Sequence, residues 1–279
     1  MKTDPPAMPA ACETCPSRRS GGWLRLGLGL SHWDYVVALA GNPNTGKSTV
    51  FNQLTGLRQH TGNWPGKTVI RAEGGFEFAG KRFKLVDLPG TYSLLATSPD
   101  EEVARNFLLF GRPDVTLAVV DATRLERNLN LVLQILEITP RVVLCLNLMD
   151  QAQRLGLQVD DRRLARDLGI PVVPTTARYR EGLEALLQAV HDVATGAVVC
   201  RGYRVRHEDS ELTRALEPLV ARLERAFPGL PNARWVALRL LDGDERVMEA
   251  VRSGEFTEPA RAPDSAPAGP ATPVTASVP

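Results

Sequence analysis

A glycine-rich stretch with a single lysine, GNPNTGKST, directly follows the apolar run Tyr35–Ala40. It fits the pattern G-x-x-x-x-G-K-[ST], in which backbone N–H groups surround phosphates between a strand and a helix. Lys47 is expected to reach the terminal phosphates of a nucleotide, and Ser48 to hold Mg²⁺ through its hydroxyl. A glycine turn without a ligand would leave the lysine unexplained. The nucleotide contacts of this loop are assigned to Gly41, Asn42, Pro43, Asn44, Thr45, Gly46, Lys47, Ser48 and Thr49.

A second motif, D-x-x-G, ends the strand-like run Phe83–Asp87. Asp87 is expected to hold Mg²⁺ through its water ligands, and the N–H of Gly90 to bind the γ-phosphate. Leu88 and Pro89 lie between them and count as contact residues. The loop over residues 88–97 then becomes a switch that responds to the γ-phosphate.

Between these motifs lies the segment His60–Thr68, which contains the sequence GNWPG. It is polar and rich in glycine, so it is expected to form no regular element and to act as the first switch. Thr68 is the candidate for closing over Mg²⁺ and the γ-phosphate. Trp64 within it is either an exposed contact residue or a local packing anchor.

The choice of base is predicted from the motif NLMD, at the end of the apolar run Val142–Asn147. A carboxylate at Asp150 can accept hydrogen bonds from N1 and the 2-amino group of guanine, whereas adenine lacks that pattern. The motif therefore predicts a site for GTP and GDP. The base contacts are assigned to Asn147, Leu148, Met149 and Asp150, together with Thr176, Ala177 and Arg178, where a backbone N–H can meet guanine O6.

Hydrolysis needs a group that orients water and a group that neutralises charge between the β- and γ-phosphates. Thr91 follows the DLPG motif at the position where Ras-like GTPases carry glutamine, so turnover is expected to be slow. The Asn44 carbonyl could complete the shell of a K⁺ ion beside the phosphates, or Asn44 could only cap the turn. The predicted catalytic residues are Asn44, Lys47, Thr68 and Gly90.

Apolar runs alternate with helical patterns along the central part of the chain. This alternation predicts an α/β fold, a P-loop NTPase G domain with a mostly parallel six-stranded sheet and helices on both faces. A small α-helical domain is expected to follow, with one helix over Leu212–Phe227 that kinks or restarts at Pro218 and another over Trp235–Val251. The predicted divisions are a disordered extension at 1–33, the G domain at 34–196, the helical domain at 208–255 and a Pro/Ala-rich tail at 256–279.

Composition limits the other possibilities. The 33 basic and 32 acidic residues leave a net charge of +1, which gives no support to a nucleic-acid binder. No apolar stretch approaches the ~20 residues of a membrane-spanning helix. Cys145 is expected to be a buried strand thiol, whereas Cys12 and Cys15 form a lone CxxC without a second ligand pair. The four histidines show no ligand spacing, so no Fe²⁺ site is predicted.

Taken together, these motifs resemble the FeoB family, the bacterial ferrous iron transport protein B. The resemblance covers about residues 34–255 and is carried by GNPNTGKSTVFNQLTG, HTGNWPGKTV, LVDLPGTYSL, SPDEEVAR, VVDATRLERNLNL, NLMD, PTTAR and RWVALRLLDGDERV. It implies a GTPase on the cytoplasmic side of the bacterial inner membrane that serves Fe²⁺ uptake through a following membrane domain, outside this chain. It further implies K⁺-stimulated hydrolysis at Asn44, a helical segment that tightens GDP binding, homo-oligomers and a FeoA-like small partner.

Two alternatives accompany this interpretation. One is a soluble ribosome- or tRNA-associated GTPase switch, which requires a basic appended domain to bind RNA. The other is a chain that folds and binds GTP but serves no transport. Because Leu148 stands where many GTPases have lysine, some packing against the base is lost, and GDP is expected to bind weakly and exchange fast.

Overall fold

The computed structural model describes residues 33–56, 59–65, 67–95, 98–203, 210–228, 230 and 232–257. The predicted N-terminal extension up to residue 32, with Cys12 and Cys15, lies outside the described residues, and so does the tail beyond residue 257. The predictions made for those segments therefore stay predictions.

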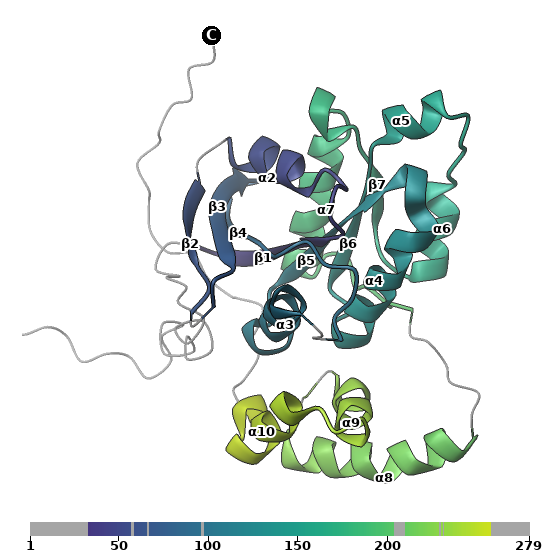
Figure 1. The fold of residues 1–279 in the computed structure, drawn as a ribbon. Helices are drawn as coiled ribbons and strands as arrows, with labels where there is room; N and C mark the ends of the chain where they lie inside the picture. Colours follow the sequence, from purple (N-terminus) through teal and green to yellow (C-terminus); the bar gives the residue numbers. More distant parts are fainter. Residues whose placement is uncertain are drawn as a thin grey trace, which may run out of the picture.

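In the part of the chain that the structure describes, seven strands form a single sheet in the order β2-β3-β4-β1-β5-β6-β7 (Figure 1). Five of them are parallel, and β3 and β2 add to β4 in antiparallel fashion at one edge. Apolar runs without polar alternation suit the central strands, because helices cover both of their faces. The strands are β1 Tyr35–Gly41, β2 Gln59–Asn63, β3 Ile70–Phe78, β4 Lys81–Asp87, β5 Val115–Asp121, β6 Val142–Asn147 and β7 Val172–Pro174.

The antiparallel edge departs from the sequence-based prediction of six strands. The expectation that His60–Thr68 forms no regular element is wrong, because Gln59–Asn63 pairs with β3. An edge strand needs backbone partners on one side only and buries little, so a polar, glycine-containing stretch can form it. The prediction relied on apolar runs, and the segment has none.

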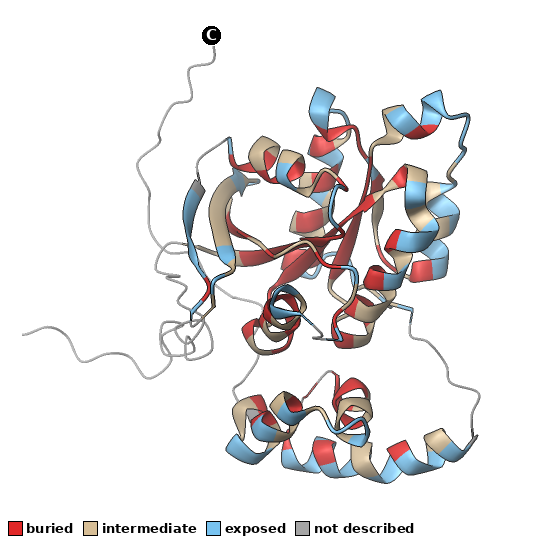
Figure 2. Ribbon diagram, in the orientation of Figure 1, coloured by how far each residue is buried: buried red, intermediate tan, exposed pale blue. Residues whose placement is uncertain are grey.

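Helices cover the two faces of the sheet (Figure 1). α2 and α7 pack on one face, whereas α3 and α4 pack on the other. Figure 2 shows the central strands buried between these layers. The helices of this domain are α2 Lys47–Thr55, α3 Pro99–Asn106, a π-helical turn Phe107–Gly111, α4 Leu125–Ile138, α5 Met149–Arg154, α6 Asp161–Leu168 and α7 Leu183–Thr195, with 3₁₀ turns at Ala122–Arg124 and Ala177–Tyr179.

The start of α3 follows ordinary capping rules. The Ser98 side chain accepts the N–H of Glu101 at 3.3 Å, and Pro99 occupies the first turn. Asp100, Glu101 and Glu102 in that turn complement the helix dipole. α3 begins shortly after the loop over residues 88–97 that is predicted to be the second switch.

Three further helices form a unit below the sheet in Figure 1: α8 Ser210–Ala226, α9 Ala233–Leu241 and α10 Glu245–Ser253, with a 3₁₀ turn at Glu255–Thr257. α8 continues through Pro218 without restarting. The single helix predicted over Trp235–Val251 is wrong, because Gly243 adopts a φ of +74° and Asp244 caps a new helix. Glycine accepts this left-handed conformation readily, so the chain turns there.

Candidate nucleotide-binding site

The loop between β1 and α2 has the conformation of a phosphate-binding loop. Gly46, at the N-terminus of α2, has a φ of +81°, and Asn44 has a φ of +66°. A Cβ atom on Gly41 would lie 2.5 Å from the Val119 carbonyl oxygen, so only glycine fits there. The helix N-terminus adds partial positive charge to the loop, an arrangement that favours an anion.

A cavity of about 450 Å³ opens over this loop, and its lining residues are Asn42, Pro43, Asn44, Gly46, Lys47, Ser48, Thr49 and Gly90. The Asn42 side chain is buried, and neither polar atom of its carboxamide has a hydrogen-bond partner in the described part of the chain. Leaving such atoms unpaired costs on the order of 1–3 kcal/mol each. A polar ligand in this cavity would therefore meet a loop with unused hydrogen-bonding capacity.

Lys47 and Asp87 form an ion pair beside the cavity, with side chains 11% and 19% exposed. The Lys47 ammonium also donates to the Leu88 carbonyl at 2.7 Å. Burial raises the pKa of the Asp87 carboxyl above its usual range, and the neighbouring Lys47 charge opposes that rise. The structure thus brings together the cation predicted for phosphate and the carboxylate predicted for Mg²⁺.

The loop predicted to be the second switch, residues 88–97, begins against the phosphate loop. The N–H of Thr91 donates to the Gly41 carbonyl at 3.3 Å, and the N–H of Leu88 donates to the Leu39 carbonyl at 2.9 Å. A Cβ atom on Gly90 would lie 3.4 Å from the Pro43 nitrogen, so the two loops are in close contact. Gly90 therefore lies against the phosphate loop and lines the same cavity.

Thr68 is exposed and is not among the residues that line the phosphate cavity. The neighbouring Trp64 is 3% exposed and packs edge-on against Phe107, with ring centroids 5.4 Å apart. The structure thus favours the packing role for Trp64 over the exposed one. The same segment contacts α3 through an ion pair between Lys67 and Glu102, at 2.8 Å.

The predicted base-binding residues converge at the ends of β6 and β7. Asn147 is 1% exposed; its Nδ2 donates to the Thr45 carbonyl at 3.0 Å, and its Oδ1 accepts the Ala177 N–H at 3.1 Å. Asp150 pairs with Arg154, whose side chain is 68% exposed. Asn147 therefore joins the phosphate loop to the loop expected to contact guanine O6.

The remaining predicted residues lie around this point. Leu148 adopts a φ of +63°, which is strained for a leucine. Met149, Asp150, Thr176 and Tyr179 are among the residues lining a second cavity, of about 520 Å³. Arg178 is exposed, with its guanidinium 5.9 Å from the centre of the Tyr179 ring.

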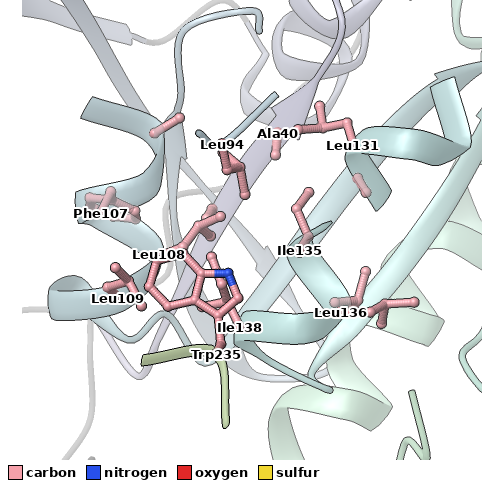
Figure 3. Close-up of a cluster of buried hydrophobic side chains, with 14 of the residues drawn as sticks. Ala40, Leu94, Phe107, Leu108, Leu109, Leu131, Ile135, Leu136, Ile138 and Trp235 are labelled. Atoms are coloured by element: carbon pink, nitrogen blue, oxygen red, sulfur yellow. The ribbon is translucent and has the colours of Figure 1, made fainter. Parts of the chain in front are cut away.

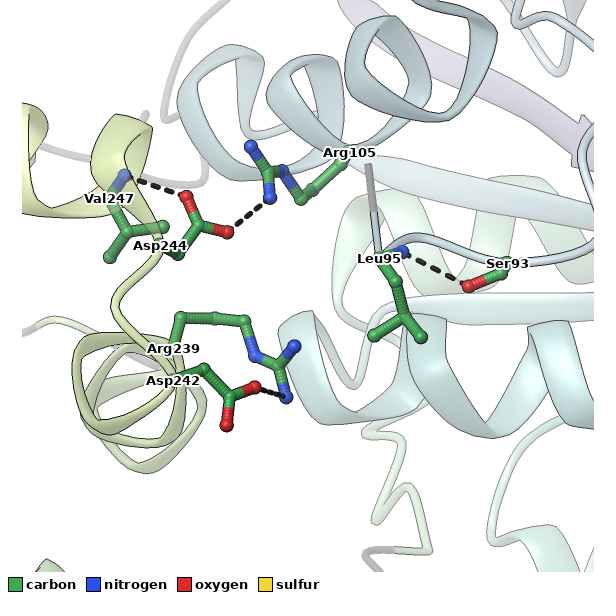
Figure 4. Close-up of polar contacts among 7 residues, drawn as sticks. All are labelled: Ser93, Leu95, Arg105, Arg239, Asp242, Asp244 and Val247. Atoms are coloured by element: carbon green, nitrogen blue, oxygen red, sulfur yellow. Dashed lines mark hydrogen bonds and ion pairs between the residues drawn. The ribbon is translucent and has the colours of Figure 1, made fainter. Parts of the chain in front are cut away.

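The contacts that hold the helical unit to the sheet domain were not predicted from the sequence. Arg105 in α3 forms an ion pair with Asp244, and the two side chains are 3% and 15% exposed (Figure 4). Trp235 of α9 packs among Leu108 and Ile138 (Figure 3). No local pattern signals an ion pair between residues 139 positions apart.

Comparison with known protein families shows which family has this architecture. A model described as "Ferrous iron transport protein B" matches residues 35–190, which is more than half of the chain, and a model of the FeoB cytosolic helical domain matches residues 209–264. The chain belongs to the FeoB family. It combines the family's N-terminal G domain with its cytosolic helical domain.

Individual FeoB proteins agree with this assignment. The Fe(2+) transporter FeoB of Shigella flexneri is 40% identical over 219 residues, covering 75% of this chain and 27% of the relative. The cytosolic domain of T. maritima FeoB in apo form has a TM-score of 0.71 at 37% identity, covering 78% of this chain and 85% of that one. A GDP-bound S. thermophilus NFeoB variant has a TM-score of 0.70 at 35% identity, covering 80% and 85%.

The chain spans about 27% of the length of the curated FeoB relatives. Within the residues that the structure describes, none of the helices is both long and apolar enough to cross a membrane. The same residues contain no cluster of three or more His, Cys, Asp or Glu side chains suited to a metal ion.

Proposed function

We propose that this chain binds and hydrolyses GTP and couples the GTP/GDP cycle to ferrous iron transport through a FeoB-type membrane domain. The observation that carries the proposal is the convergence of Lys47, Asp87 and Asn147 at one edge of the sheet, next to a loop built for phosphate. Parallel strands all end on the same side of the sheet, and ligands of α/β proteins bind beside these carboxyl ends. A relative with the same fold is bound to GDP.

The phosphates would lie in the cavity over the phosphate loop, with Lys47 on the terminal phosphates. Ser48 and Asp87 offer the hard oxygen ligands that Mg²⁺ prefers, and both lie at this cavity or beside it. Bound there, Mg²⁺ would neutralise charge on the β- and γ-phosphates. Asn42 would find partners for its buried carboxamide, and Gly90 would donate its N–H to the γ-phosphate.

Guanine would be read by Asp150 and the Ala177 loop. The pairing of Asp150 with the exposed Arg154 is weak in water, so the N1 and 2-amino groups of guanine can replace it. The Ala177 N–H already donates to Asn147, so guanine O6 must share that hydrogen bond or lengthen it. Together with Leu148 in place of lysine, this favours weak and rapidly exchanging GDP.

Slow, K⁺-stimulated hydrolysis is a further part of the proposal. Thr91 carries no group like the glutamine that orients water in Ras-like GTPases. Asn44 is exposed at the cavity with a φ of +66°, so its carbonyl can help to hold a monovalent cation beside the phosphates. Thr68 would have to move toward the cavity to close over the γ-phosphate.

Membership of the FeoB family supports a proposal for the setting of this activity. We place the chain on the cytoplasmic side of the bacterial inner membrane, with a FeoA-like small protein and homo-oligomers as candidate partners. A ribosome- or tRNA-associated switch has no support from the near-neutral charge. Isothermal titration with GTP, GDP and ATP analogues tests the proposal, together with phosphate release from GTP. A preference for adenine nucleotides would overturn it.

A further inference from the structure

Two side chains of α4 hold the loop that is predicted to be the second switch. The Oε1 atom of Gln134 accepts the Leu94 N–H at 2.7 Å and the Ser93 hydroxyl at 3.3 Å. Nearer the start of α4, the Arg127 guanidinium lies over the Tyr92 ring, 4.4 Å from its centre. The loop therefore runs along α4, in contact with it at two points.

The Gln134 carboxamide has one orientation that suits this contact. Its Oε1 accepts two hydrogen bonds, which fills both acceptor sites, and its Nε2 donates to Asn130 Oδ1 at 3.4 Å. Turned over, its NH₂ group would face the Leu94 N–H, and two donors would oppose each other. Ser93 Oγ also accepts the Leu95 N–H at 3.0 Å, so the contact organises three consecutive loop residues (Figure 4).

Burial holds the same point of the loop from its apolar side. The Leu94 side chain is 3% exposed and belongs to the buried cluster that includes Ala40 and Leu131 (Figure 3). Gln134 is only half-buried, so it is not needed to fill this cluster. Its contribution is the hydrogen bond that fixes the direction of the loop backbone.

The residue that this backbone positions is Gly90, which lines the phosphate cavity. Just after it, the Thr91 N–H donates to the Gly41 carbonyl of the phosphate loop. The stretch from Gly90 to Leu94 is thus held by the phosphate loop at one end and by α4 at the other. Fixing the backbone of one free residue costs on the order of 1–2 kcal/mol, so a ligand that uses the Gly90 N–H binds more tightly when the loop is already held.

We propose that Gln134, assisted by Arg127, is a positioning residue for the γ-phosphate, because it holds this loop with Gly90 at the phosphate cavity. The proposal rests on the proposed function, in which the Gly90 N–H meets the γ-phosphate. GDP has no γ-phosphate, so the contact between α4 and the loop favours GTP over GDP.

The test compares GDP with GppNHp, a non-hydrolysable analogue of GTP, each with Mg²⁺ at about 0.15 M salt. Titration calorimetry gives dissociation constants for the wild type, Gln134→Met, Gln134→Glu and Asn130→Ala, with a urea unfolding curve for each. Gln134→Met keeps the side-chain length and helix propensity but removes the acceptor. It is expected to weaken GppNHp about tenfold, as for the loss of one hydrogen bond, and GDP by less than about twofold.

Two further variants separate positioning from a purely structural role. Gln134→Glu keeps an acceptor oxygen and should restore the wild-type preference for GppNHp over GDP. Asn130→Ala is the matched control on the same face of α4, and should change neither constant. A purely structural role of Gln134 would lower the free energy of unfolding but leave the ratio of the two dissociation constants unchanged.

Equal losses for the two nucleotides in Gln134→Met would overturn the proposal, and so would no loss, tighter GppNHp, or a glutamate variant that behaves like methionine. If Gln134→Met does not fold, Arg127→Ala carries the same comparison, with an expected loss of about two- to threefold confined to GppNHp. Equal affinity changes in that variant overturn the proposal likewise. A wild type that binds neither nucleotide, or GDP alone, contradicts the proposed function itself.

Discussion

Asp244 has two structural roles that substitution can separate. Its carboxylate pairs with Arg105 across the contact between α3 and the helical unit, and the other carboxylate oxygen accepts the Val247 N–H at 3.1 Å to cap α10 (Figure 4). Asp244→Asn keeps a good capping group but removes the charge. Asp244→Ala removes both.

The expected losses in free energy of unfolding follow from how deeply each carboxylate is buried. Removing one partner of a buried ion pair costs about 3–5 kcal/mol, and since Asp244 is 15% exposed the lower end applies, about 3 kcal/mol for Asp244→Asn. Asp244→Ala should cost about 1 kcal/mol more, the usual worth of a helix cap. The matched control is Asp242→Asn, because Asp242 pairs with Arg239 at 3.0 Å but is 59% exposed, so its loss should stay below about 0.5 kcal/mol.

Urea unfolding followed by circular dichroism measures these differences, with the slope compared among variants to check that the transition keeps its cooperativity. A cost for Asp244→Asn no larger than that of Asp242→Asn would refute the reasoning, since the buried pair would then contribute nothing to holding the helical unit in place.

Four shorter predictions concern the nucleotide site and the buried thiol of Cys145 in β6. The wild type should turn over GTP faster in K⁺ than in Na⁺, and Asn44→Ala should lose that difference; equal rates in all four measurements would discard the K⁺ role. GDP release should be fast and should slow in Leu148→Lys, and a stopped-flow half-life of hours for the wild type would contradict this. In Gly46→Ala, the new Cβ would lie 2.4 Å from Asn147 Nδ2, at a residue whose φ is +81°. At Gly56 the φ is +61°, but a Cβ would meet open space. The melting temperature of Gly46→Ala should therefore fall well below that of Gly56→Ala. The Cys145 thiol, with its pKa raised by burial to about 12, should resist iodoacetamide between about pH 7 and 9 until urea unfolds the chain, as peptide mapping would show.

The sequence was sufficient for the parts of the site whose positions depend on strand ends. Gly41, Asp87 and Asn147 each end an apolar run, and parallel pairing of those runs brings them to one edge. The pattern of apolar residues thus predicted both the core and the place where these three residues meet. The buried Cys145 followed from the same pattern and is confirmed.

Contacts between distant segments could not be predicted in this way. The ion pair of Arg105 with Asp244 and the hydrogen bond of Thr175 with Asn147 depend on how separate elements pack, and each residue type is ordinary in its local sequence. The edge strand Gln59–Asn63 was missed for another reason, since backbone pairing alone forms it.

That edge strand has a mechanical consequence for the segment predicted to be the first switch. The side chains of His60, Thr61 and Asn63 are exposed, so detaching the strand would expose little of the hydrophobic core. What is lost is a ladder of main-chain bonds, which water can largely replace. This strand can separate from β3 and pair with it again while the other strands stay paired. Its movement toward a bound phosphate therefore need not disturb the remainder of the sheet.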